Sequence, residues 1–175
     1  MPRQIRKPAS LTDFEFALQA PIALGRRFYQ IAVAAAAEVH EPVGLIPLEF
    51  AVLIHLHGAP GIDQNTLAEY MALDRTSTGE LVYRLEQQGL IDRPVNGTDR
   101  RARVLRLTAR GLALHNKQRP KARASQERLL DVLTPAERRS LVDMMERVIA
   151  ANPQYARPGA GRRRRSTVER AKATP

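Results

Sequence analysis

Apolar residues recur at the three- and four-residue spacing of α-helices along most of this chain. The first such run begins at Leu11 and ends near His40. Pro21 lies inside it, so this proline either kinks one helix or begins a second one. The run is longer than a small domain needs, which fits a helix that pairs with a second copy of the chain.

Three shorter runs follow and predict helices at about 47–57, 64–71 and 76–88. Only a short turn at 72–74 separates the last two. Two short helices joined by three or four residues form a helix-turn-helix, whose second helix enters the major groove of DNA through its N-terminal residues. The sequence therefore predicts a recognition helix that begins near residue 75.

A basic β-hairpin is predicted directly after this motif. Residues 90–93 give a first strand, and the pair Asn96-Gly97 favours a tight turn. Residues 103–107 mix apolar side chains with arginines, as in a strand with one solvent-facing side, and Thr108 can cap the next helix. A basic hairpin beside a helix-turn-helix is typical of a DNA-reading wing.

Two more helices complete the pattern. One begins after Thr108 and ends at about Leu130, and Pro120 is expected to bend or interrupt it. Residues 134–137 combine a threonine cap, a proline and a glutamate, so they begin a last helix that ends near Ala151. Its apolar face is expected to be buried and consists of Leu141, Met144, Met145 and Val148.

The predicted fold class is mostly α with a small β-wing (α+β), a winged helix-turn-helix flanked by N- and C-terminal dimerisation helices. Five parts are expected along the chain. They are a basic N-terminal arm at 1–10, an N-terminal dimerisation helix at 11–46, a winged helix-turn-helix lobe at 47–108, C-terminal dimerisation helices at 109–151 and a basic disordered tail at 152–175.

The net charge of +10 is unevenly distributed. Residues 11–74 carry a net charge of −6, whereas residues 75–123 carry +8. The arm at 1–10 and the tail at 152–175 are also basic, with +3 and +6. A basic tail alone is equally well explained as a solubilising segment. Solubility does not explain the basic block at 75–123 equally well. Positive charge concentrated in one segment favours a polyanionic partner.

Several functional classes are excluded or disfavoured by composition. The chain has no cysteine, which excludes disulfides, thiolate metal sites and thiol redox switching. No nucleophile–base pair, metal-ligand cluster or phosphate-binding glycine loop is present, so neither an enzyme nor a cofactor is expected. No apolar run reaches the ~18 residues of a membrane helix, and the basic N-terminus does not resemble a signal peptide. A cytoplasmic protein without a membrane partner is expected.

The start of the recognition helix carries the first candidate DNA-binding residues. Small hydroxyl side chains approach base edges or phosphates closely, although serine and threonine favour helix starts in any case. An arginine further along the helix adds a cation. The candidates in this helix are Arg75, Thr76, Ser77, Thr78 and Arg84.

The wing carries the second group of candidates, Asp99, Arg100, Arg101 and Arg103. Either Arg100 or Arg101 could enter an adjacent minor groove, whose narrow and negative geometry favours arginine. Asp99 weakens phosphate attraction unless it orients an arginine through a charge-assisted hydrogen bond. The alternative is that Asp99 is only a turn residue.

Several segments in the same order resemble the MarR family of bacterial transcriptional regulators: 48–53, 65–68, 73–78, 85–93 and 99–111. The similarity covers roughly residues 11–151. It implies a homodimer that pairs through its terminal helices and grips a palindromic operator in double-stranded DNA. It also implies a small aromatic carboxylate effector, bound between the dimer helices and the DNA lobe, that releases the DNA.

The opening helix and basic tail are similar to MarR-type repressors of aromatic or pyridine-carboxylate breakdown, which implies a hydroxylated nicotinate as effector. Such a ligand needs a cation or imidazole donors near an apolar slot. A histidine on an apolar helix is more often an ordinary core residue. The candidates are Arg26, Arg27, Tyr29, His40, His55 and His57. An alternative function is that of a sequence-indifferent architectural protein that coats DNA with the same lobe and the arginine tail.

Overall fold

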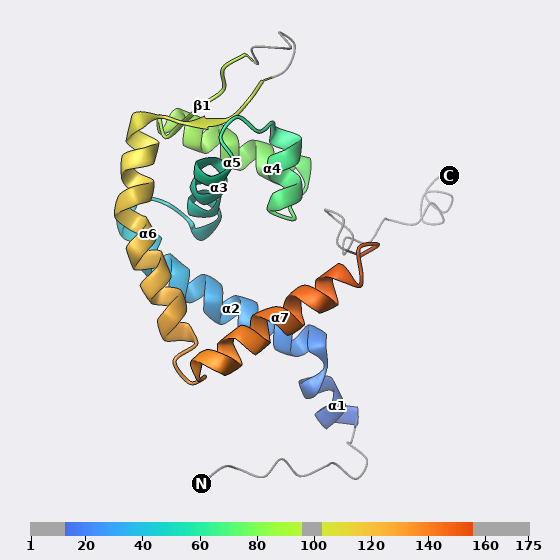
Figure 1. The fold of residues 1–175 in the computed structure, drawn as a ribbon. Helices are drawn as coiled ribbons and strands as arrows, with labels where there is room; N and C mark the ends of the chain where they lie inside the picture. The colour runs from blue at the N-terminus through green and yellow to red at the C-terminus, as the bar shows by residue number, and fades with distance from the viewer. Residues whose placement is uncertain (1–12, 96–102, 156–175) are drawn as a thin grey trace, which may run out of the picture.

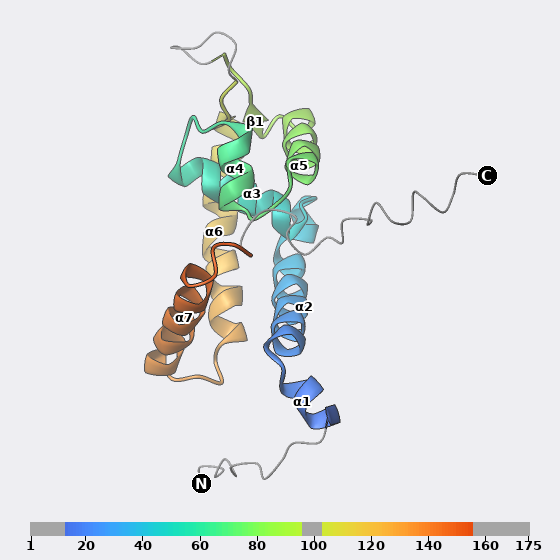
Figure 2. The same cartoon turned by 90° about the vertical axis from the view of Figure 1, so that its right-hand side faces the viewer.

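The structure, a computed structural model, describes residues 13–95 and 103–155 (Figure 1). The basic arm and most of the basic tail therefore lie outside the described residues. A compact lobe of short helices carries the hairpin at one end (Figure 1). Long helices extend beyond its opposite end, and one of them begins beside the hairpin and runs along the lobe (Figure 1). Two of these long helices, α2 (Pro21–His40) and α6 (Ala109–Leu129), pack side by side (Figure 2).

Pro21 begins a second helix. A short α1 (Asp13–Gln19) ends before it, and α2 (Pro21–His40) has the proline in its first turn, where a missing N–H costs no hydrogen bond. A 3-10 turn, η1 (Glu41–Val43), follows and closes at Gly44, whose φ of +75° is readily adopted only by glycine. The chain then turns into the lobe.

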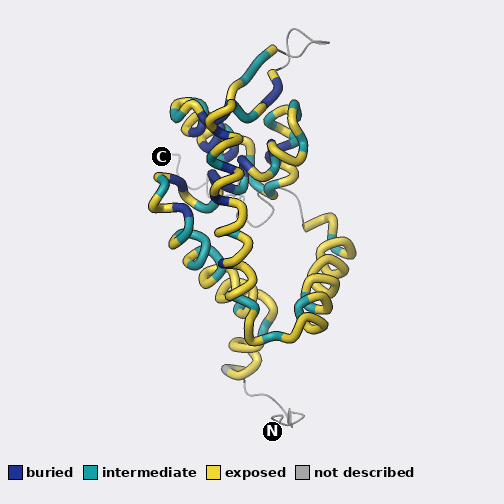
Figure 3. The backbone as a smooth tube through the Cα atoms, turned by 60° about the vertical axis from the view of Figure 1, so that its left-hand side comes forward, coloured by how far each residue is buried: buried dark blue, intermediate teal, exposed yellow. Residues whose placement is uncertain are grey.

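The helix-turn-helix prediction is confirmed. The lobe contains α3 (Pro47–Gly58), α4 (Gln64–Tyr70) and α5 (Arg75–Gln87). Their apolar faces meet in one core, which appears as the dark-blue part of the tube in Figure 3. Its members include Phe50, Leu53, Leu56, Leu67, Leu81, Val82, Leu85, Leu90, Ile91 and Leu105. Burial of this set is the main stabilising contribution to the lobe.

The wing is present, but its regular strands are shorter than predicted. Strands β1 (Ile91–Asp92) and β2 (Arg106–Leu107) pair in antiparallel register, and one further bridge joins Val95 to Arg103. Leu105 does not pair with β1 because its N–H and C=O bond to the 61–62 segment at 2.8 and 3.0 Å. The predicted turn at the tip lies outside the described residues, which omit 96–102.

The wing and α6 (Ala109–Leu129) are joined by a close backbone approach. Thr108 caps α6 by accepting from the Gly111 N–H at 3.0 Å, and its own N–H donates to the Leu90 carbonyl at 3.1 Å. A Cβ placed at Gly111 would lie 1.9 Å from that same carbonyl oxygen. Only glycine fits there. Pro120 lies inside α6, which continues through it without interruption.

The last helix, α7 (Pro135–Ala150), begins at the predicted capping box, in which Thr134 and Glu137 bond reciprocally. The prediction that its apolar face is buried is wrong for a single chain: none of its residues is buried, and Met144, Met145 and Val148 are 54%, 45% and 65% exposed. Among residues 13–95 and 103–155, no other segment buries this face, and α7 is exposed along almost its whole length (Figure 3).

Within the described residues, no single helix has the length and apolar content to cross a membrane. Among the described helices, the segments 21–43 and 47–58 reach that length and apolar content only when they are counted together, and they are bent by 83° relative to each other.

Candidate nucleic-acid interface and ligand cavity

Asp74 holds the N-terminus of α5, the recognition helix. One carboxylate oxygen accepts from the Ser77 N–H, and the other accepts from the Ser77 hydroxyl, both at 2.9 Å. This side chain satisfies donors that a helix start would otherwise leave unpaired. The position and direction of the first turn of α5 are therefore fixed from within the lobe.

The candidate residues of this first turn divide into two groups. Arg75 and Thr76 are exposed and Ser77 is half-buried. Thr78 is completely buried, and its hydroxyl donates to the Asp74 carbonyl at 2.9 Å. In this structure Thr78 packs inside the lobe, so Arg75 and Thr76 are the side chains that the helix start presents outward.

Arg84 has a partner inside the protein. Its Nε lies 3.2 Å from Oε1 of Glu49, a residue of α3 whose side chain is only 4% exposed. The other carboxylate oxygen of Glu49 accepts from the Ile46 N–H at 2.8 Å and caps α3. The pair links the recognition helix to α3, although about half of the Arg84 side chain remains exposed.

At the base of the wing, Arg103 is exposed and its Nη1 donates to the Arg93 carbonyl at 3.2 Å. Arg93 itself reaches Glu86 of α5 at 3.8 Å and Gln64 of α4 at 3.4 Å. The wing is thus tied to both helices of the helix-turn-helix. The predicted tip residues Asp99, Arg100 and Arg101 lie outside the described residues.

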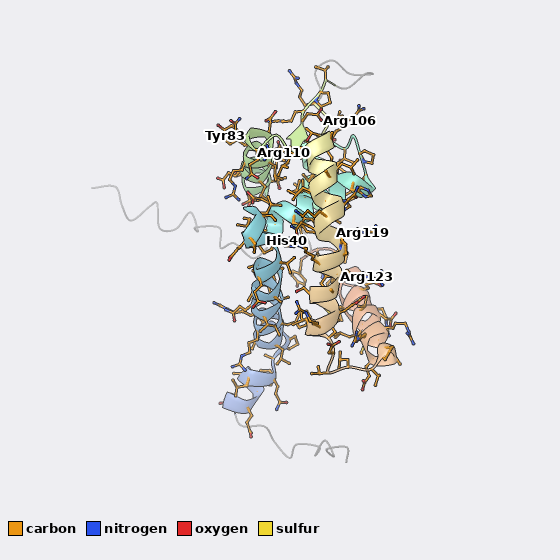
Figure 4. The ribbon with its side chains drawn as sticks, turned by 90° about the vertical axis from the view of Figure 1, so that its left-hand side faces the viewer. His40, Tyr83, Arg106, Arg110, Arg119 and Arg123 are labelled. Atoms are coloured by element: carbon orange, nitrogen blue, oxygen red, sulfur yellow. The ribbon has the colours of Figure 1, made fainter. Side chains whose placement is uncertain are left out.

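A cavity of about 150 Å³ lies where α2, α3 and α6 meet. His40, at the end of α2, lines it and is labelled in Figure 4. Most of the remaining lining is apolar, with Ser125 and Gln126 contributed by α6. Ser125 donates to the Ala35 carbonyl at 2.9 Å and so ties α6 to α2.

His40 is 3% exposed, and no described residue forms a hydrogen bond with its Nδ1. Burial lowers the pKa of His40 below its ordinary value of 6.5, so the ring is neutral at pH 7. Buried polar atoms are almost always hydrogen-bonded. His40 therefore combines an unpaired, buried imidazole nitrogen with a place in the lining of a mainly apolar cavity.

Four rings stack in succession from this cavity toward the wing. His40 lies 4.2 Å from Phe50, Phe50 lies 6.1 Å from His115, and His115 lies 4.2 Å from His57, measured between ring centroids. Burial, followed by the nearby His57 and Arg119, lowers the pKa of His115, whereas a hydrogen bond to Asn116 opposes this shift.

The six ligand candidates are not brought together. Arg26, Arg27 and Tyr29 are exposed on α2 and lie outside the cavity lining, which contains only His40 of the six. His55 bonds to the Ala51 carbonyl at 2.8 Å and stacks on Tyr70. His57 faces a different hollow near the wing. The sequence analysis missed Ser125 and Gln126, although polar residues next to the buried stripe of α6 were a usable signal.

Comparison with known proteins identifies the family. The MarR family pattern matches residues 43–102. An HTH-type transcriptional repressor of Mycobacterium tuberculosis is 30% identical over 128 residues, which span 71% of this chain and 92% of the relative. The chain belongs to the MarR family. It is accordingly a DNA-binding transcriptional regulator with a winged-helix fold, and its family is one of regulators rather than enzymes.

Two solved structures of MarR-type regulators are similar over most of the chain. The PcaV regulator of Streptomyces coelicolor, solved with its natural ligand, has 30% identity and a TM-score of 0.68, covering 81% of this chain and 98% of PcaV. BpsR of Bordetella bronchiseptica, whose DNA binding is regulated by 6-hydroxynicotinic acid, has 25% identity and a TM-score of 0.71, covering 75% and 94%.

Proposed function

We propose that this chain is a homodimeric repressor that binds a palindromic operator and is released by a single-ring aromatic carboxylate. One observation carries the DNA-binding part. Asp74 fixes the start of α5 so that Arg75 and Thr76 point outward, beside a wing base that carries Arg103. In helix-turn-helix proteins this end of the helix contacts base edges in the major groove.

The uncovered apolar faces support the homodimer. Ile22 on α2 is 84% exposed, and Val148 and Ile149 on α7 are 65% and 60% exposed. Monomeric soluble proteins rarely expose large contiguous apolar patches. A second copy would bury these faces and make residues 11–46 and 109–151 the dimerisation parts. It would also place two recognition helices on successive turns of one DNA face.

The cavity beside His40 supports the effector class. A mainly apolar cavity of about 150 Å³ matches the size of one that holds a benzene ring. The unpaired Nδ1 of His40 offers a polar contact for a carboxylate or ring hydroxyl. PcaV was solved with a natural ligand and BpsR responds to 6-hydroxynicotinic acid. A hydroxylated pyridine carboxylate is therefore our first choice of effector.

The proposed mechanism is a shift between two conformations. The cavity lies between the long helices and the lobe, so a ligand there binds best to one orientation of the lobe. If that orientation no longer matches grooves about 34 Å apart, the operator is released.

Fluorescence anisotropy tests the DNA-binding part. Labelled DNA from the region upstream of the gene is titrated with protein, and scrambled DNA of equal length serves as reference. Arg75→Ala should weaken operator binding by about 1–3 kcal/mol and reduce sequence discrimination. Arg119→Ala, which removes an exposed cation from α6, is the matched control and should retain that discrimination. Equal affinity of the wild type for both DNAs would favour the architectural alternative.

The effector part needs a separate titration. 6-Hydroxynicotinate is added to the preformed complex, and His40→Phe is compared with the wild type. Phenylalanine preserves a ring next to Phe50 but removes the nitrogen. We expect the variant to need at least about tenfold more ligand for release, as loss of a charge-assisted hydrogen bond implies. An equal response of both proteins would remove His40 from the proposed site.

A further inference from the structure

A second hollow, separate from the cavity beside His40, lies at the base of the wing. It has a volume of about 260 Å³ and is formed by the end of α3, strand β2 and the first turn of α6. Its walls combine apolar side chains with two nitrogen-bearing ones. Those that carry the argument are Leu56, His57, Arg106, Leu107 and Leu112.

Arg106 supplies the positive charge of this hollow. It is exposed on β2, next to the start of α6 (Figure 4), and no ion pair joins it to another described residue. Its cross-strand neighbour is Asp92, but the two side chains do not form an ion pair. The Nε of Arg106 passes 4.0 Å from the point where a side chain at Gly61 would begin. The Arg106 side chain therefore lies near the turn that contains Gly61.

His57 supplies a second donor on a ring that is held in place. Its imidazole is stacked on the buried His115 with ring centroids 4.2 Å apart and planes inclined by 18°. Leu56 is almost completely buried, whereas Leu112 is 41% exposed. The hollow therefore presents a cation and an imidazole beside a partly exposed apolar wall.

We infer that this hollow binds a small monocarboxylic acid with an apolar, single-ring body. A guanidinium group pairs with a carboxylate through two parallel hydrogen bonds, and a neighbouring imidazole N–H can donate a third. The leucine walls accommodate the ring. The volume of about 260 Å³ is small beside the roughly 300–1,000 Å³ of sites for drug-sized ligands, which favours a ligand with a single ring.

Occupancy of this site changes the charge of the wing. Arg106 is on the return strand of the hairpin, so a bound carboxylate neutralises one cation of the wing. Each phosphate contact contributes about 0.9 to the slope of log affinity against log salt. If Arg106 contacts a phosphate of bound DNA, filling the hollow should lower that slope by up to about 0.9. This inference does not depend on the effector cavity, and the two can fail separately.

Benzoate and selective histidine labelling provide the test. The chain has only four histidines, so imidazole NMR signals of the full-length protein can be assigned one by one. On titration with benzoate, the His57 signals should shift and saturate. Arg106→Gln should abolish this response, whereas Arg110→Gln, which removes a neighbouring exposed cation outside the hollow, should retain it.

A relayed signal must be distinguished from direct binding, because stacked rings connect His57 to His40. Ala32→Leu fills the other cavity, which Ala32 lines. Direct binding predicts that His57 still responds in Ala32→Leu. The inference is overturned if His57 does not shift up to the solubility limit of benzoate, if Arg106→Gln responds like the wild type, or if only Ala32→Leu abolishes the shift.

Discussion

The guanidinium of Arg84 on the recognition helix lies 3.2 Å from the buried carboxylate of Glu49 on α3. Glu49 also caps its own helix through the Ile46 N–H. A carboxylate that is 4% exposed needs a charged partner, because burial of an unpaired charge is costly. The pair therefore positions α5 relative to the rest of the lobe.

Arg84→Met should destabilise the protein and weaken DNA binding to all sequences alike. Because Arg84 is about half exposed, we expect a loss of about 1–2 kcal/mol in the free energy of unfolding. Chemical denaturation measures it. In a double-mutant cycle, Arg84→Met should cost much less in a Glu49→Leu background. Additive losses would mean that the two side chains are not coupled.

Asp74 should matter more for DNA recognition than for stability. Asp74→Ala removes the cap of α5, and a lost cap costs about 1 kcal/mol of folding free energy. Asp63 caps α4 in the same manner, through the N–H groups of Asn65 and Thr66. Asp63→Ala is thus a control of equal chemistry. The Asp74 variant should lose more operator affinity than the Asp63 variant at similar stability. The reverse order would contradict the role assigned to the start of α5.

Gly111→Ala should disrupt the junction between the wing and α6. The added Cβ would lie 1.9 Å from the Leu90 carbonyl oxygen, so the backbone must shift. Overpacking of this kind costs about 1–3 kcal/mol, and here it also displaces the wing. Gly58→Ala, with nothing within 4 Å of the new atom, is the control. In thermal denaturation, Gly111→Ala should melt at a clearly lower temperature than Gly58→Ala. Similar melting temperatures of the two variants would contradict the close approach.

The free energy of unfolding should fall as the pH drops below about 6.5. Burial lowers the pKa of both His40 and His115 from that ordinary value. Below pH 6.5 the unfolded chain therefore binds more protons than the folded one, and the loss of stability ends once the pH is below the folded pKa values. Urea denaturation between pH 5 and 8 measures the slope. His40→Phe combined with His115→Phe should flatten it, and an unchanged slope would contradict this origin.

Sequence patterns predicted the elements well because local signals and burial agreed. Proline and the threonine–glutamate box defined the start of α7. The start of α5 was predicted from apolar spacing after the turn at 72–74, and the cap that Asp74 forms was not recognised. Gly111 was recognised only as part of a motif. A glycine is needed at this position because the backbone passes close to the Leu90 carbonyl oxygen. Such close backbone approaches between distant segments leave no pattern in the local sequence.

The candidate sites were predicted less completely, for a related reason. Periodicity shows which face of a helix is apolar but not what covers it. The α7 face was expected to be buried and is exposed within one chain. Likewise, Arg84 was selected for its charge, but the position of Glu49 one helix away decides how that charge is used.

The most direct test of the account is the affinity of the full-length protein for operator and scrambled DNA, measured with and without 6-hydroxynicotinate at one fixed salt concentration. Typical specific sites bind about 10³–10⁷ times more tightly than non-specific DNA. We predict a preference in that range without ligand and its loss when the ligand is bound. Equal affinity for the two DNAs, or a preference that no single-ring aromatic acid alters, would contradict it.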